Sequence, residues 1–264
     1  AGFSAPPKTW KEFEEQCLAI TEKTGKKGYA YAEGASTFDA WLYSRGVEQL
    51  NADQTKAIFN GPEGVESLAM MVRLIEAGAA YKPEGQYADQ AEFGKGNVAF
   101  VMASTSGTYY YQKAIADAGG LVKEWGQTNM PQSDPSNPKT VLYGGSFTIF
   151  KTTDVKQKAA WLFVKFFTDT AQTAKWGSQS GYMPVRKSAA AQLTDYFAKN
   201  PVAKEQFETI VPYGYPEPSV RGDQEIRTFI EEAQTAAFEG VMTPQEALDA
   251  AVKKADEALA AGRE

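Results

Sequence analysis

Residues 93–108 read FGKGNVAFVMASTSGT, and this segment indicates the fold class. A glycine-rich turn leads into the apolar run Val98–Met102, which is typical of a strand buried on both faces in a parallel sheet. The polar group Ser104–Thr108 follows at once, ahead of a predicted helix. Open α/β sheets bind ligands at the carboxyl ends of their strands, so these hydroxyls are candidate ligand contacts. An ordinary N-cap for the next helix explains the same residues equally well.

Amphipathic helices and short strands alternate on both sides of this segment. Thr9 and Glu12 have the spacing of a capping box, and they precede a helix expected to end at Gly25. A short strand is predicted at Tyr29–Tyr31, and a second helix after Pro62. This alternation predicts an α/β fold with a mostly parallel sheet flanked by helices.

The second half of the chain contains a glycine pair followed by helices. Two short strand pieces are predicted at Val141–Tyr143 and Phe147–Phe150, on either side of Gly144 and Gly145. Glycine inside a strand marks a bend, a bulge or the close approach of another group. Helices are expected after residue 154, up to residue 181, over 187–199, 201–210 and 223–239, and from residue 243.

Composition excludes several classes of function. The 264 residues carry a net charge of −6 with a pI of about 5.0, so no nucleic-acid partner is expected. The chain has no histidine and a single cysteine, Cys17, which removes histidine-dependent nucleophiles and the usual metal sets. We therefore expect no catalytic residues, metal or cofactor. Ala1–Trp10 lacks the basic and apolar segments of an export signal.

Individual binding candidates remain open at the level of single residues. Aromatic faces cover sugar C–H groups, which makes Phe38, Trp41 and Tyr182 candidates, although most aromatic side chains belong to a core. Tyr182 stands out because it lies in a Gly-Tyr-Met-Pro turn between helices. Arg227, near the start of a predicted helix, could hold a phosphate or carboxylate in a bidentate contact, or could pair with Glu231 one turn later.

Six segments, in the same order, resemble the extracellular solute-binding proteins of carbohydrate-class ABC importers, in particular members that bind sn-glycerol 3-phosphate. The segments are PKTWKEF (7–13), GKGNVAF (94–100), GGS (144–146), SGYMP (180–184), IR (226–227) and TPQEAL (243–248). Members of this family have two α/β lobes of the type II periplasmic-binding-protein kind. The lobes close about a hinge over a solute, which is then delivered to the permease subunits.

The resemblance also implies which residues contact the solute. The positions carried over are Thr105, Ser106, Gly145, Tyr182 and Arg227, and the neighbouring candidates Ser104, Phe38 and Trp41 complete the predicted set. The Trp-rich stretch of the glycerol-phosphate binders is replaced here by residues 36–41, so the identity of the solute stays open.

The resemblance predicts a division of the chain into lobes. Residues 1–143 and 182–264 are expected to form the carboxy-terminal lobe, and residues 144–181 the hinge and a segment of the amino-terminal lobe. Family members carry a further half-lobe before the segment that matches Ala1, so the chain is expected to be a fragment. Phe147, Phe150, Phe163, Phe166 and Phe167 are then expected to lack part of their cover.

The function predicted from the sequence is solute binding without chemistry. The chain is expected to be the substrate-binding component of an ABC importer for a sugar or a phosphorylated polyol, working with permease subunits. It is expected in the periplasm or outside the cell, lipid-anchored or soluble. The alternatives are a lobe of a carbohydrate-active enzyme and a ligand sensor for a signalling partner.

Overall fold

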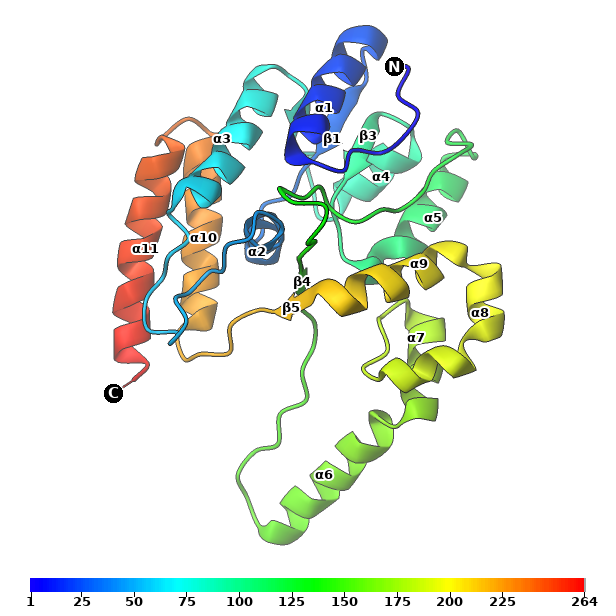
Figure 1. Cartoon of the computed structure of the whole chain (residues 1–264), viewed down its shortest axis with the longest axis vertical. Helices are drawn as coiled ribbons and strands as arrows, with labels where there is room; N and C mark the ends of the chain where they lie inside the picture. Colours follow the sequence, from blue (N-terminus) through cyan, green and yellow to red (C-terminus); the bar gives the residue numbers. More distant parts are fainter. Residues whose placement is uncertain (264) are drawn as a thin grey trace. The chain divides into compact units, whose positions relative to one another are not determined.

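The computed structural model describes residues 1–263, which form two compact units (Figure 1). Unit 1 comprises residues 1–103, 111–143 and 213–264, and unit 2 comprises residues 104–110 and 144–212. The chain enters the long segment of unit 2 after Tyr143 and returns to unit 1 at Tyr213. The helical segment beyond residue 182 belongs to unit 2 because it packs against the helix before it. These units follow contacts within this chain, and the predicted division into lobes at residues 143 and 182 stays a prediction.

Unit 1 is an α/β structure with parallel strand pairing. Its elements are α1 (Trp10–Thr24), β1 (Lys27–Ala30), α2 (Ala35–Ser44), α3 (Pro62–Glu76), β2 (Ala80–Tyr81), α4 (Ala88–Gly94), β3 (Val98–Val101), most of α5 (Thr108–Asp117), β4 (Thr140–Leu142), β5 (Gly214–Pro216), α10 (Asp223–Phe238) and α11 (Pro244–Ala261). One sheet has the order β2-β1-β3, and β4 pairs with β5 in a second sheet. All of these pairs are parallel, which confirms the predicted fold class.

Strand β3 is less buried than the sequence predicts. Val98 is buried, whereas Phe100 and Val101 are half-buried. The strand lies at the edge of the β2-β1-β3 sheet, so its outer side has no neighbouring strand in the described part of the chain. The apolar run therefore lines an edge and not the centre of the sheet.

Local signals fix where α1 begins and how closely it packs. The Thr9 side chain accepts a hydrogen bond from the Glu12 backbone N–H, and the Glu12 carboxylate accepts one from the Thr9 N–H, as the capping box predicts. Gly25 ends the helix at φ 70°. At Gly28 a Cβ atom would lie 2.5 Å from the Cα of Cys17, so only glycine lets β1 approach α1 this closely.

The core of unit 1 joins residues from distant parts of the chain. Helix α2 is almost wholly buried, and it contacts α3, α10 and β4. Figure 1 shows α10 and α11 lying side by side, and both also contact α3. The largest fully buried side chains are Trp41, Tyr29, Phe13, Phe38, Phe59, Leu42, Leu68, Met70, Met71, Leu74, Ile226 and Ile230.

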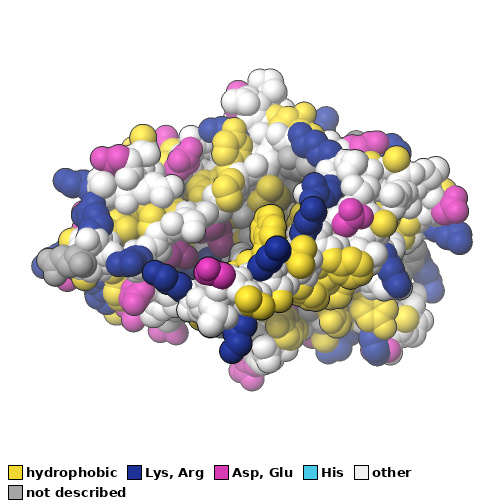
Figure 2. All heavy atoms as spheres, turned by 90° about the horizontal axis from the view of Figure 1, so that it is seen from below, with side chains coloured by type: hydrophobic (Ala, Val, Ile, Leu, Met, Phe, Trp, Pro, Cys, Tyr) yellow, Lys and Arg dark blue, Asp and Glu magenta, His cyan; other side chains and the backbone are white. Residues whose placement is uncertain are grey.

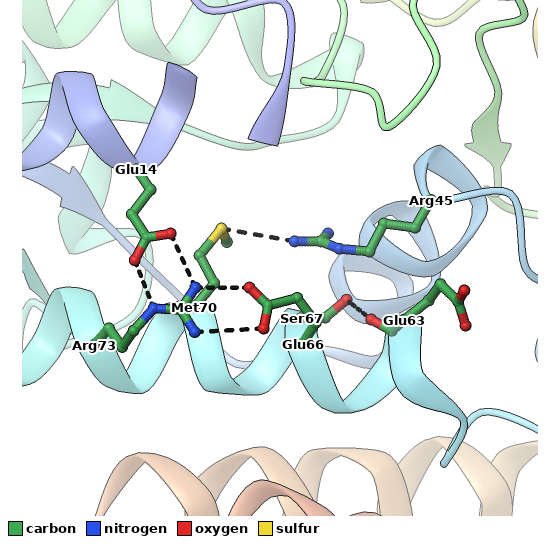
Figure 3. A network of polar contacts seen from close by, with 7 residues as sticks. All are labelled: Glu14, Arg45, Glu63, Glu66, Ser67, Met70 and Arg73. Atoms are coloured by element: carbon green, nitrogen blue, oxygen red, sulfur yellow. Dashed lines mark hydrogen bonds and ion pairs between the residues drawn. The ribbon is translucent and has the colours of Figure 1, made fainter. Parts of the chain in front are cut away.

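A polar network connects α1 to α3 at the surface of unit 1 (Figure 3). Arg73 donates from Nε and from a terminal nitrogen to the two oxygens of Glu14, at 2.6 and 2.9 Å, and it also binds Glu66. Nearby, the Arg45 guanidinium stacks 4.1 Å above the Trp10 ring and donates to the Met70 sulfur. Burial lowers the pKa of Arg45 to about 10, so the guanidinium stays charged at neutral pH. The network joins α1 to α3 over the core.

Unit 2 is helical. Its elements are η1 (Thr105–Gly107), α6 (Asp154–Phe167), α7 (Thr170–Ser180), η2 (Lys187–Gln192), α8 (Thr194–Lys199), α9 (Pro201–Ile210) and the start of η3 (Val211–Tyr213). The predicted strand at Phe147–Phe150 is wrong, because this segment is irregular. The described part of unit 2 contains no strand with which it could pair, and an isolated strand leaves its backbone groups unbonded. The core of the unit is small and centres on Ala174, Ala189 and Leu193.

An apolar face of unit 2 is open to solvent. Helix α6 has no buried side chain, and Figure 2, which views the molecule from the side where α6 lies, shows hydrophobic side chains gathered there. The exposed aromatic and aliphatic side chains of this unit include Phe147, Phe150, Trp161, Leu162, Phe163, Phe166 and Trp176. The ring of Phe167 is half-buried against Phe147 and Trp176. We call this surface the α6 face.

Among the residues that the structure describes, no helix combines the length and apolar character that a membrane crossing requires.

Candidate functional site

The predicted binding residues fall into two polar groups, one in each unit. In unit 2, Ser104 caps η1, since its hydroxyl accepts a hydrogen bond from the Ser106 N–H at 3.4 Å. The two serine hydroxyls lie 3.0 Å apart, and the Thr108 hydroxyl donates to the Thr105 carbonyl. The N-cap explanation therefore holds for Ser104, while the half-buried hydroxyls of this loop remain suitable for a polar solute.

The turn after α7 places Tyr182 beside this hydroxyl loop. Gly181 caps α7 at φ 75°, and a Cβ added there would lie 3.7 Å from the Ser106 backbone. Tyr182 follows directly, its side chain 46% exposed and its ring centroid 6.3 Å from that of Trp176. An accessible aromatic ring next to hydroxyl groups has the composition of a sugar-contacting surface.

The glycine pair lies in irregular backbone at the start of the long segment of unit 2. A Cβ on Gly144 would lie 4.0 Å from a ring carbon of Tyr182, so Gly144 lies close to the tyrosine. Gly145 is exposed, and a Cβ there would meet no atom within 4 Å. Unit 2 thus brings Ser104, Thr105, Ser106, Gly145 and Tyr182 into one neighbourhood.

In unit 1, Arg227 is held by two partners, Glu217 ten residues earlier in the sequence and Ser36 191 residues earlier. One terminal nitrogen donates to Glu217 at 2.9 Å, and the other donates to the Ser36 hydroxyl at 2.9 Å. The alternative prediction that Arg227 pairs with Glu231 is wrong. The guanidinium binds Glu217 and Ser36, and the Glu231 carboxylate accepts a hydrogen bond from the Ala35 N–H. Side-chain exposures of 24% for Arg227 and 18% for Glu217 make the pair partly accessible.

A second acidic residue of this region, Asp39, is enclosed without a hydrogen bond. Its side chain is 1% exposed, and neither carboxylate oxygen has a hydrogen-bond partner. Burial, followed by the charge of Glu217, raises the pKa of Asp39 well above its usual range, while Arg227 opposes the shift. Burial also raises the pKa of Asp223, again against the effect of Arg227.

The same carboxylates act on Arg227. Burial lowers the pKa of its guanidinium, but the hydrogen bond to Glu217 and the charges of Glu217, Asp39 and Asp223 outweigh burial. The pKa of Arg227 therefore lies above its ordinary value and the side chain is charged at any physiological pH. Among the described residues there is no group of three or more histidine, cysteine, aspartate or glutamate side chains arranged to hold a metal ion.

Phe38 and Trp41 are core residues in this structure. Both have 0% exposure, and both belong to the hydrophobic cluster of unit 1. Phe38 packs edge-on against Phe59 with ring centroids 6.0 Å apart, and the Trp41 indole N–H points to the Met102 sulfur at 3.3 Å. Neither side chain presents a surface to a solute here, so the structure gives no support to their predicted contact role.

Ser36, Asp39 and Glu217 were not in the predicted set. The sequence did offer a signal for Asp39, because it is an acidic residue inside the aromatic run Phe38–Trp41. Burying an acidic side chain in such a helix costs free energy unless the side chain is paired. Glu217 gave no signal in the sequence. Glu217 follows β5 directly, and its contact with Arg227 depends on the path that the chain takes between β5 and α10.

Parallel strands alternate with helices in unit 1, so this is an α/β protein, and its fold is of the periplasmic-binding type. The chain belongs to the bacterial extracellular solute-binding protein family, whose family model matches residues 2–205.

Named relatives and solved structures agree with this family. The chain is 28% identical over 272 residues to the sn-glycerol-3-phosphate-binding periplasmic protein UgpB of Yersinia enterocolitica, an alignment that covers 95% of the chain and 60% of the relative. It is similar to the cyclic alpha-maltosyl-1,6-maltose binding protein of Arthrobacter globiformis, with 25% identity and a TM-score of 0.79 over 97% of this chain and 65% of that one. The sugar-binding protein MalE of Xanthomonas citri shares the fold, with 20% identity and a TM-score of 0.81 over 99% of this chain and 66% of that one. The chain thus spans about three fifths of the length of the curated relatives it matches.

Proposed function

We propose that this chain is the substrate-binding component of a bacterial ABC importer, which binds a sugar or a glycerol-3-phosphate-like solute and delivers it unchanged to the permease subunits. The family match over residues 2–205 carries the proposal. The relatives named for binding sn-glycerol 3-phosphate and maltosyl sugars supply the two solute classes.

The proposed solute contacts are the polar groups of each unit. In unit 1 Arg227 donates hydrogen bonds to the most polar group of the solute. In unit 2, taken by itself, the proposed contacts are the hydroxyls of Thr105 and Ser106, the backbone N–H of Gly145 and the Tyr182 side chain, which offer donors, acceptors and a ring face. The partial exposure of Arg227 and Tyr182 is consistent with this role.

The proposal assigns no catalytic residue to the chain. The sequence lacks histidine, so a histidine general base, the commonest kind, is absent. The proposed location is the periplasm or the cell exterior, as for the periplasmic relatives, with the chain either soluble or lipid-anchored. We further propose that a second lobe covers the α6 face. Its support is the exposed apolar surface there together with the 60% coverage of the relatives.

The test is a calorimetric titration of the chain with maltose, ribitol and sn-glycerol 3-phosphate. Replacing Arg227 by alanine removes a charge-assisted contact, so the affinity for whichever solute binds should fall by about 10- to 150-fold. Arg227→Lys should recover part of this loss, because an ammonium cannot reproduce the planar fork of the guanidinium. The exposed Arg221 provides the matched control, and Arg221→Ala should leave the affinity unchanged.

Two outcomes contradict the proposal. Equal affinities for wild type and all Arg227 variants would show that Arg227 does not contact the solute. Saturable turnover of a glycoside or a phosphate ester, measured by chromatography of the products, would mean that the chain is part of a carbohydrate-active enzyme and not a binding protein.

A further inference from the structure

Asn60 and Gly61 join a loop of unit 1 to helix α3. Gly61 is the N-cap of α3, with φ −69° and ψ 176°, an extended conformation that other residues adopt as readily. A Cβ added to Gly61 would lie 3.7 Å from the Ile58 carbonyl oxygen and 3.9 Å from the Glu63 carboxylate, which are ordinary van der Waals separations. In contrast to Gly28, neither the backbone conformation nor the packing requires a glycine at this position.

The pair has the sequence at which asparagine is chemically least stable. The backbone nitrogen of the next residue can attack the side-chain amide carbon of an asparagine, and a glycine leaves the path of that nitrogen open because it has no side chain. Asn60 is the only asparagine of the chain that precedes a glycine. In the described part of the chain the Gly61 N–H donates no hydrogen bond, so no acceptor holds the attacking nitrogen.

The Asn60 side chain attaches this loop to helix α11. Its Nδ2 donates to Asp249 Oδ1 at 2.6 Å, and Gln245 Nε2 donates to the same oxygen at 2.9 Å and to the Asn60 carbonyl at 3.3 Å. The Ala57 N–H makes a further bond to α11, since it donates to Asp256 at 2.8 Å. Asn60 is half-buried and Asp249 is exposed, so water reaches the attachment.

We propose that Asn60 is a site of spontaneous deamidation, and that the modification turns its attraction to α11 into repulsion. The Gly61 nitrogen gives its proton to solvent base and bonds to Asn60 Cγ. The Cγ–Nδ2 bond breaks, and the leaving nitrogen takes up a proton and departs as ammonia. One water molecule then opens the resulting succinimide ring at either carbonyl, which yields aspartate or isoaspartate. The net reaction consumes one water and releases one ammonia.

The product carries a negative charge where a hydrogen-bond donor was. A carboxylate at position 60 cannot donate to Asp249, and the two like charges repel each other. The dipole of α3 favours a negative charge just before its first turn, but it acts against both the lost charge-assisted bond and the repulsion. The isoaspartate product also inserts a methylene group into the backbone ahead of the N-cap. Both products therefore weaken the attachment of the loop to α11.

The chemical step is tested on the whole chain by peptide mapping. Wild type and Gly61→Ala are incubated at pH 6 and pH 9, and mass spectrometry measures the one-dalton gain at each asparagine. Deamidation of Asn60 should be at least about tenfold slower in Gly61→Ala, because the added methyl group obstructs the attack. It should be faster at pH 9 in wild type, because the attacking nitrogen must lose its proton. Asn51, which precedes an alanine, is the internal control.

The structural consequence is tested by urea unfolding of Asn60→Asp, Asp249→Asn and the double variant at pH 8. Asn60→Asp alone should raise the equilibrium constant for unfolding about two- to fivefold, the size of an exposed charge contact. The same replacement in the Asp249→Asn background should cost nothing or should stabilise the chain, because the repelling charge is gone and the α3 dipole remains.

Two results overturn the proposal. Asn60 could deamidate no faster than Asn51, or equally fast in wild type and in Gly61→Ala, which shows that the site is not reactive. Alternatively, Asn60→Asp could have the same effect with and without Asp249, which shows that the modification does not act on the attachment to α11.

Discussion

Asp39 is the residue whose protonation should influence stability most directly. Its pKa is raised by burial, so between the ordinary aspartate pKa and the raised value the folded chain holds a proton that the unfolded chain has released. The stability that Asp39 contributes is therefore fully present at low pH. It decreases as the pH rises above the ordinary value of about 4.

Replacing this side chain by its neutral isostere should remove the pH-dependent loss. Asp39→Asn is expected to be more stable than wild type by about 1–3 kcal/mol at pH 8, because the folded wild type must either keep a proton that the unfolded chain has released or bury an unpaired charge. The difference should shrink toward zero near pH 4. Urea unfolding at a series of pH values measures it.

The control for this prediction has the opposite sign. The exposed Asp134 accepts hydrogen bonds from the Ser136 hydroxyl and N–H, which lower the pKa of its carboxyl. Asp134→Asn should therefore lose stability relative to wild type as the pH rises through the acid range. A gain for Asp39→Asn that does not change with pH would show that its effect is steric and not electrostatic.

At the scale of elements, the two long helices of different units should respond differently to truncation. Ile230 on α10 is fully buried in the core of unit 1, whereas Leu162 on α6 is 54% exposed. Ile230→Ala should cost about 3 kcal/mol of unfolding free energy through lost contacts and a cavity. Leu162→Ala should cost under about 0.5 kcal/mol, since its side chain lies on the α6 face.

Thermal and urea unfolding of both variants measure this difference. Comparable losses for the two truncations would mean that another surface covers α6 in solution. Repeating the comparison at several protein concentrations identifies self-association as that cover, because only then does the cost rise with concentration.

Elements whose ends are set by local chemistry were predictable from the sequence. The capping box at Thr9 forms as predicted and a second one forms at Thr243, while Gly25 and Gly181 both end helices in the left-handed conformation. The strand expected at Phe147–Phe150 does not form, because a strand needs a neighbouring strand to pair with. The local sequence does not reveal whether such a neighbour is present.

The candidate site was predictable only in part, for the same reason. Arg227 was identified as a candidate, yet its partner in the structure is Glu217 and not Glu231. Its second partner, Ser36, is 191 positions away, a contact that arises from tertiary packing. Two of the aromatic residues assigned to the candidate site, Phe38 and Trp41, instead fill the core of unit 1.

At the scale of the whole molecule, the two units should differ in stability. The core of unit 1 contains many large buried side chains, whereas that of unit 2 centres on Ala174, Ala189 and Leu193. A unit that buries less apolar surface is less stable, so unit 2 should unfold at lower urea concentration than unit 1.

Tryptophan fluorescence can separate the two transitions. Trp161 and Trp176 belong to unit 2, and Trp10, Trp41 and Trp125 belong to unit 1. A variant in which Trp161 and Trp176 are replaced by phenylalanine should lose the early transition and keep the late one. A single transition at the same urea concentration in wild type and variant would show that the two units unfold together.

The make-up of the unit 1 core also determines when it can form. The cluster combines Phe13 and Trp41, from early in the chain, with Ile230 and Leu248, from α10 and α11. Because α10 and α11 are made long after α1 and α2, the hydrophobic surfaces of α1 and α2 have no partner until these later helices have been synthesised. Contacts between such distant residues also form slowly. The growing chain therefore stays open until α10 and α11 have been made, and an open chain is the form that a narrow secretion channel can thread.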